Sequence, residues 1–159
     1  MMKKIKIIIA ILVLAFITIQ FIRPKRNEGK VNPAQTLAGI YNPPDSVQRI
    51  LQIACMDCHS DQTNYPWYFK TQPAAWIMAH HIREGKEELN LDEFGSYSGL
   101  RQRSKLQDMR DEIRDGVMPL KSYKLFHPEA RLSGEQKKVM VHWLSHKVDS
   151  LNRVELQMP

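Results

Sequence analysis

Both cysteines of the chain lie in the segment Cys55–His59, which reads Cys-Met-Asp-Cys-His. Three kinds of chemistry use this pattern: a redox dithiol, part of a zinc site, and the covalent attachment of a haem. Two residues between the cysteines let both thiols reach the two vinyl groups of a porphyrin, and the adjacent His59 can then point its imidazole at the iron. The pattern therefore predicts one covalent haem c, held by Cys55, Cys58 and His59.

The rival interpretations lack supporting residues. A zinc site needs further ligands, commonly a second Cys or His pair, and the remaining histidines follow no finger-like spacing: His80, His81, His127, His142 and His146. A thioredoxin-like dithiol would require a βαβ context, which is missing. A disulfide between Cys55 and Cys58 would close too small a loop to add much stability.

A second axial ligand of the iron is expected from a methionine or a histidine. The candidates are Met78, Met109, Met118, Met140, His80, His81 and His127. Met118 is favoured because it follows Gly116, where a helix is expected to end, and precedes Pro119, which stiffens the loop. His80 or His81 is the alternative.

The surroundings of the haem can also be anticipated. The Nδ1–H of His59 should donate to a backbone carbonyl that fixes the ring, and Pro66 and Pro73 lie in the loop behind it. Four aromatic side chains are expected to pack around the porphyrin: Trp67, Trp76, Phe94 and Trp143.

The elements that would position these residues are helices. Residues 45–54 place Val47, Ile50, Leu51 and Ala54 on one face, with Asp45 or Ser46 as the N-cap. A second helix is predicted over 74–90, with Gly85 as a weak point or early stop. No run of alternating β-branched residues competes with these patterns, so the domain is predicted to be all-α.

Two further helices complete the expected domain. One runs over about 98–115, ends at Gly116, and carries mixed charges that are typical of a solvated face. The last begins at a capping box formed by Ser133 and Gln136. Its inward face should consist of Val139, Met140, Trp143 and Leu144.

The N-terminus carries an apolar run, Ile7–Ile22, between basic flanks. We expect residues 1–23 to form an uncleaved signal anchor or transmembrane helix, or alternatively a cleaved signal peptide. Residues 24–44 are rich in Asn, Gly and Pro and are predicted to be a linker. The domain would then occupy 45–149, followed by a C-terminal tail over 150–159.

The formal net charge of +6 arises within the first 30 residues, because the rest of the chain has equal numbers of basic and acidic side chains. Binding to nucleic acid requires clustered Lys and Arg that release counterions from phosphates. The composition of the domain therefore gives no support for a nucleic-acid partner.

Several longer motifs extend the Cys-x-x-Cys-His pattern: "CMDCHSDQTNYPWY", "HHIREGKEELNLDEFGSYS", "MPLKSYKLFHPEARLS" and the tryptophan of "VHWL". With them, the chain resembles the bacterial haem-binding domain family of single-haem c-type cytochrome-like proteins over about residues 45–144. The resemblance implies a cytochrome c-like helical fold with one haem attached at Cys55 and Cys58. It also implies His59 as the proximal ligand and Met118 as the distal one.

The expected function is single-electron transfer by a mono-haem c-type cytochrome, not an enzyme activity. Because haem is attached to such proteins outside the bacterial cytoplasmic membrane, the domain is expected in the periplasm, anchored in the inner membrane or released after cleavage. Its partners would be periplasmic or membrane redox proteins. The alternative is a haem-based sensor or peroxidase-like enzyme with an exchangeable distal ligand, where His80 or His81 would act on the bound molecule.

Overall fold

The structure is a computed structural model that describes residues 2–155, with side chains for 2–153. The prediction of an all-α protein is confirmed: over this range the chain forms α-helices and 3₁₀ turns, and the single β-type contact is an isolated bridge between Glu28 and Gln62. Of the expected tail, residues 150–155 continue the last helix, and 156–159 lie outside the described residues.

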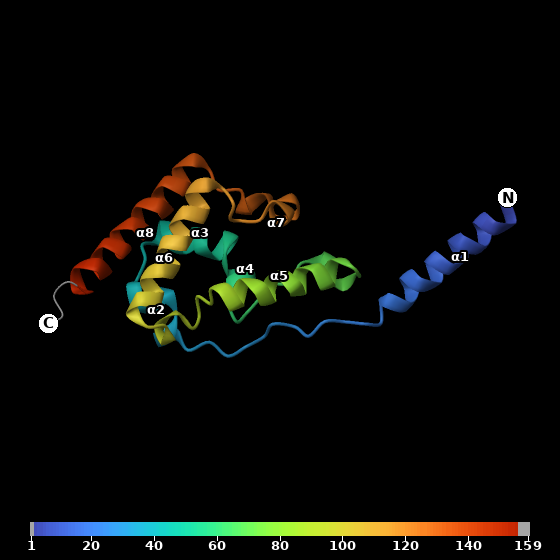
Figure 1. Ribbon diagram of the computed structural model, residues 1–159, viewed down its shortest axis with the longest axis horizontal. Helices are drawn as coiled ribbons and strands as arrows, with labels where there is room; N and C mark the ends of the chain where they lie inside the picture. The colour runs from blue at the N-terminus through green and yellow to red at the C-terminus, as the bar shows by residue number, and fades with distance from the viewer. Residues whose placement is uncertain (1, 156–159) are drawn as a thin grey trace.

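Figure 1 shows a helical body from which the N-terminal helix projects. The α-helices are α1 (Met2–Ile19), α2 (Leu37–Tyr41), α3 (Asp45–Ala54), α4 (Met56–His59), α5 (Ala74–Glu88), α6 (Gly99–Asp115), α7 (Lys121–Phe126) and α8 (Gly134–Glu155). Short 3₁₀ turns lie at Pro33–Gln35, Trp67–Lys70, Phe94–Ser96 and Pro128–Ala130.

The signal anchor expected over residues 1–23 is not supported. Helix α1 ends at Ile19, and three lysines lie in its first turns. None of its residues is buried against the body. Among the described residues, no helix is both long and apolar enough to span a membrane.

The segment 24–44, expected to be a linker, lies against the domain over much of its length. Leu37 is only 1% exposed, and its backbone N–H donates to the carbonyl of Leu91 at 2.7 Å. Thr36 caps α2 by accepting from the N–H of Gly39 at 2.9 Å. The sequence did not reveal α2 because a helix of five residues is too short to show an apolar period.

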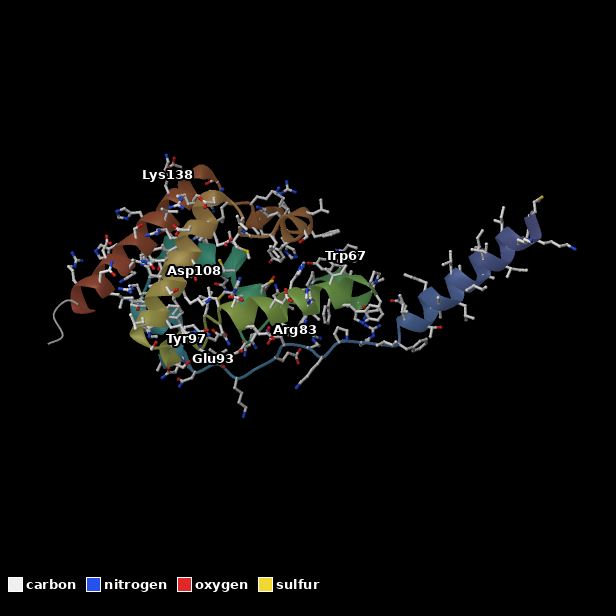
Figure 2. All side chains as sticks on the ribbon, in the orientation of Figure 1. Trp67, Arg83, Glu93, Tyr97, Asp108 and Lys138 are labelled. Atoms are coloured by element: carbon white, nitrogen blue, oxygen red, sulfur yellow. The ribbon has the colours of Figure 1, made fainter. Side chains whose placement is uncertain are left out.

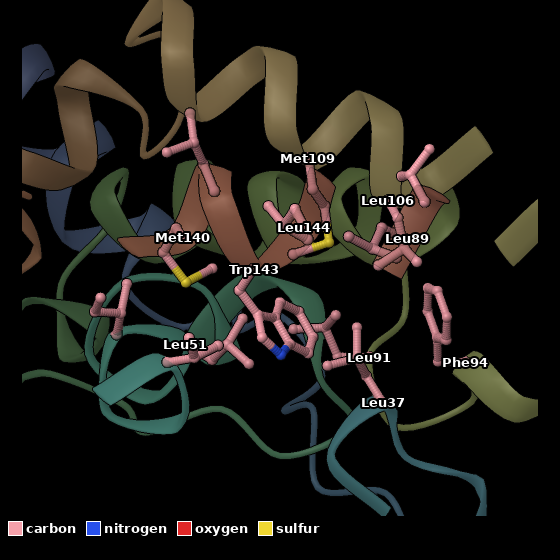
Figure 3. Close-up of a cluster of buried hydrophobic side chains, with 14 residues drawn as sticks. Leu37, Leu51, Leu89, Leu91, Phe94, Leu106, Met109, Met140, Trp143 and Leu144 are labelled. Atoms are coloured by element: carbon pink, nitrogen blue, oxygen red, sulfur yellow. The ribbon is translucent and has the colours of Figure 1, made fainter. Parts of the chain in front are cut away.

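The core lies where α6 packs along α8 and where α3 meets α8 (Figure 3). The predicted apolar face of α3 is confirmed, since its four residues are all buried. On α8 the prediction is correct for Met140, Trp143 and Leu144. It is wrong for Val139, which is 38% exposed. The buried stripe of α8 runs from Met140 through Leu144 to Val148, and Val139 lies at its edge.

The predicted helix ends are largely as the sequence indicated. Ser133 Oγ accepts from the N–H of Gln136 at 3.1 Å, and the Gln136 side chain accepts from the N–H of Ser133 at 2.8 Å, so the capping box of α8 is confirmed. Helix α6 ends at Asp115, and its C-cap Gly116 has a left-handed φ of 74°. At α3 the N-cap is Pro44, not Asp45 or Ser46.

Helix α5 continues through Gly85, which was expected to weaken or end it. The reason for the glycine is the close approach of α4. A Cβ at this position would lie 2.8 Å from the carbonyl oxygen of Cys58 and 3.2 Å from its Cβ. Only a residue without a side chain allows α5 to pack against α4 at this distance.

Candidate functional site

The cysteine motif forms one short helical turn. Cys55 joins α3 to α4, and its carbonyl accepts from the N–H groups of Cys58 at 3.2 Å and His59 at 3.0 Å. Cys55 and Cys58 are free thiols, each partly buried. The turn therefore places two thiols and an imidazole on one rigid piece of backbone.

His59 is fixed at three points. Its N–H bonds to Cys55, its carbonyl accepts from the N–H of Leu91 at 2.8 Å, and its Nδ1 lies 3.0 Å from the carbonyl oxygen of Leu89. With Nδ1 as the donor to this carbonyl, Nε2 carries a free lone pair for a metal. The expected backbone acceptor is thus present, but it is Leu89 and neither Pro66 nor Pro73.

The two thiols are in an environment that favours their neutral form. Burial raises the pKa of Cys55 to about 12, with a further contribution from Cys58. Burial, and then the charge of Asp57, raises the pKa of Cys58 to about 11. A redox dithiol needs a thiol with a lowered pKa, because the thiolate is the reactive species. The local electrostatics therefore do not favour a redox dithiol.

Two neighbouring cavities open beside α4. One has a volume of about 320 Å³ and the other about 240 Å³. Cys55, His59, Met118 and Pro119 line both. The volume of the larger one by itself lies at the lower end of the volumes typical of small-molecule and cofactor sites. The expected attachment residues and the favoured distal methionine thus face one common space.

Met118 lies in a loop that the end of α6 holds in place. The N–H groups of Val117 and Met118 donate to the carbonyl of Glu112, at 3.0 and 3.2 Å. Gly116 makes this reversal possible through its left-handed conformation. The backbone of Met118 is therefore tied to the wall of the cavity.

The other candidates for the second axial position separate clearly. Met109 lines the larger cavity and His81 the smaller. His80 lines neither; it contacts Arg83 at 2.9 Å and Glu84 at 3.4 Å. The remaining three, Met78, Met140 and His127, also lie outside both linings.

The aromatic side chains expected around the porphyrin do not line these cavities. Phe94 and Trp143 belong to the core, and Trp76 donates through Nε1 to the carbonyl of Ile22 at 2.9 Å. Trp67 is 73% exposed. Figure 2 shows Trp67 near the outer end of α5, on the side of the body away from Asp108 of α6. The apolar walls come instead from aliphatic side chains: Ala54, Leu89, Leu91, Ile113 and Leu132.

Asp57, which lies between the two cysteines, is hydrogen-bonded by residues outside the motif. Tyr123 of α7 donates to Asp57 Oδ2 at 2.7 Å, and the N–H of Asn64 donates to Oδ1 at 3.1 Å. Burial and the bond to Asp57 raise the pKa of Tyr123. These contacts connect α4 to α7 on the side where Cys58 lies.

Sequence reasoning missed three charged residues of α6 that line the larger of these two cavities, Lys105, Asp108 and Glu112. Their helix was predicted to present a solvated face, yet Glu112 Oε2 is buried without a hydrogen-bond partner. The spacing of Lys105, Met109 and Glu112 is that of one helix face. That spacing was the available signal.

A larger cavity, of about 660 Å³, lies elsewhere and is lined by Met56, Asp57, Ser60 and His127, among others. It contains none of Cys55, Cys58, His59 or Met118. We therefore assign the chemistry to the two smaller cavities, where the thiols and the imidazole converge.

The residues at these cavities fit a haem. The thiols, the oriented imidazole and the sulfur-bearing Met118 face the same mainly aliphatic space, which suits a large apolar ring with an iron at its centre. In the part of the chain that the structure describes, no group of three or more His, Cys, Asp or Glu residues is placed to hold a metal ion. A haem brings its own four nitrogen ligands and needs no such group.

An all-helical domain with this arrangement is a candidate haem protein. The family model described as "Haem-binding domain" matches residues 14–146, so the chain belongs to the haem-binding domain family. This confirms the resemblance seen in the motifs and supports haem as the cofactor. No curated protein and no solved structure matches the chain.

Proposed function

We propose that the domain binds one haem covalently through Cys55 and Cys58, with His59 and Met118 as axial ligands of the iron, and that it carries single electrons. The observation that carries this proposal is the setting of His59. Its Nδ1 is engaged by the Leu89 carbonyl at 3.0 Å, while the ring borders the same cavities as Cys55 and Met118.

The haem supplies the redox-active iron, and the chain determines its surroundings. Backbone bonds to Cys55 and Leu91 hold His59 in place, and the Leu89 carbonyl orients its imidazole. A ligand held rigidly in both oxidation states requires little reorganisation when one electron is gained or lost, which suits an electron carrier. Methionine as the second ligand raises the reduction potential relative to a second histidine.

Met118 is our choice for the distal ligand because of its loop. Its backbone is tied to Glu112 and it lines both cavities, whereas Met109 and His81 each line one. Met109 also belongs to the buried core cluster. His80, one of the two expected alternatives, contacts neighbours on the exposed face of α5 instead.

Covalent attachment of haem through two thioethers takes place outside the cytoplasmic membrane of bacteria. We therefore propose that the domain is exported and acts in the periplasm, exchanging electrons with redox proteins there or at the membrane. The apolar run within residues 1–23 supports this location as a targeting signal.

A second function is a haem-based sensor or a peroxidase-like enzyme, in which the distal ligand gives way to a small molecule. The buried Glu112 Oε2, which has no partner, is the observation that favours it, and His81 borders the adjoining cavity. A carboxyl beside the iron could exchange a proton with a bound molecule.

A visible absorption spectrum of the protein, matured together with a haem-attachment system, tests the proposal. For a closed His/Met site we expect the weak far-red band of sulfur-ligated ferric haem, and no response of the reduced protein to carbon monoxide. Met118→Ala should abolish that band and allow carbon monoxide to bind, while Met78→Ala, a buried methionine outside the cavities, should do neither. Rapid binding of carbon monoxide by the unaltered protein would favour the sensor or enzyme.

A further inference from the structure

Of the two cavities beside α4, the larger one, of about 320 Å³ and hereafter the larger cavity, has a single Lys or Arg among its described lining residues, Lys105 of α6. The Lys105 side chain is 20% exposed. Its Nζ lies 3.3 Å from Glu88 Oε2 and 3.9 Å from Asp108 Oδ2. Both carboxylates are mostly exposed to solvent, and ion pairs of that kind are weak. Lys105 can therefore change partner at little cost.

Lys105 and Cys58 border different cavities of the site. Cys58 lines the smaller cavity only, Cys55 lines both, and Lys105 lines the larger cavity only. Lys105 therefore borders the part of the site that Cys58 does not reach, and Cys55 borders both parts. In a haem, the vinyl groups that react with thiols and the two propionates occupy different edges of the ring.

We propose that Lys105 binds a haem propionate, which replaces one of its present carboxylate partners. This inference rests on the proposed function, because it requires the vinyl edge to be tied at Cys55 and Cys58. A partly buried carboxylate needs a cation or a hydrogen-bond donor. The other charged residues lining the larger cavity, Glu88, Asp108 and Glu112, are acids, so Lys105 is the charged donor available there.

The proposal predicts a specific response of the haem to Lys105→Gln. Without the cation, the propionate charge is less neutralised and stabilises the ferric state, so the reduction potential falls. The propionate bending band in the resonance Raman spectrum should shift as well. Both effects should persist at high salt because the pair is partly buried. Lys105→Arg should keep the potential close to that of the original protein.

Two control variants isolate the effect. Lys138→Gln removes a largely exposed lysine on α8, which pairs with Glu135 at 2.9 Å, and should change neither readout (Figure 2). Glu88→Gln removes the ion pair between Lys105 and α5 but leaves the charge of Lys105. If Lys105 merely joined α5 to α6, Glu88→Gln would reproduce the Raman shift; under our proposal it does not.

The outcomes can be told apart. Intact mass without a haem would overturn the proposed function itself. A haem-bearing Lys105→Gln protein with the potential and Raman band of Lys138→Gln would overturn only the role of Lys105. If Lys105→Gln does not accumulate, Lys105→Arg still decides, because a guanidinium bound to the propionate shifts the bending band and an unbound one leaves it unchanged.

Discussion

Gly85→Ala tests whether the close packing of α5 on α4 holds the turn Cys55–His59 in place. The added Cβ would lie 2.8 Å from the carbonyl oxygen of Cys58 and 3.2 Å from the Cys58 Cβ. Neither atom can move away by a side-chain rotation. The two helices must therefore separate by several tenths of an ångström.

Two effects of opposite sign set the magnitude. In an open helix position, alanine is more favourable than glycine by about 1 kcal/mol. Overpacking in a close contact typically destabilises by about 1–3 kcal/mol. Because the clash at Gly85 is with backbone, we expect the upper part of that range, and a net loss of about 1–2 kcal/mol in the free energy of unfolding.

Urea unfolding of the haem-loaded protein measures this loss, and intact mass measures the fraction that carries haem. Gly99→Ala and Gly134→Ala are matched controls, since nothing lies within 4 Å of a Cβ at either position and both begin a helix. The controls should be neutral or slightly stabilising. If Gly85→Ala is as stable as they are, our account of the α4–α5 contact is wrong.

Three further changes probe the support of the site. Phe94→Ala removes a fully buried ring that packs against Tyr41 and Tyr97, and should lower the free energy of unfolding by about 3–5 kcal/mol in chemical denaturation. Tyr123→Phe removes the 2.7 Å bond to Asp57 and should destabilise by about 1–2 kcal/mol, with a lower yield of attached haem; an unchanged yield and stability would show that α7 does not support α4. Ser133→Ala removes the cap of α8 and should lower the melting temperature, corresponding to about 1 kcal/mol, whereas no change would mean that solvent caps this end equally well.

The parts of the site that the sequence predicted are those set by local spacing. The placement of two thiols and an imidazole on one turn follows from their spacing in the sequence, and the apolar face of α3 follows from a 3.6-residue period. The end of α6 at Gly116, which positions Met118, follows from a backbone conformation that glycine favours. In each case the determining contacts lie within a few positions along the chain.

The parts that escaped prediction depend on contacts between distant segments. The acceptor for His59 is the carbonyl of Leu89, and a backbone carbonyl leaves no trace in the residue type. In the sequence, Lys105 lies among mixed charges that are typical of a solvated helix face. The structure shows that it also lines the larger cavity, where it pairs with Glu88. At Gly85 the sequence indicates a weak point in a helix, since the nearby Cys58 belongs to another helix and its closeness is visible only in the folded chain.

The support of the imidazole reaches back into the segment expected to be a linker. The N–H of Leu37 in α2 donates to the Leu91 carbonyl at 2.7 Å, and the N–H of Leu91 donates to the His59 carbonyl at 2.8 Å. Two residues before Leu91, the Leu89 carbonyl orients the ring itself. A displacement of α2 would therefore reach His59 through one short backbone chain. The match to the haem-binding domain family begins at residue 14, well before α3, and so includes α2.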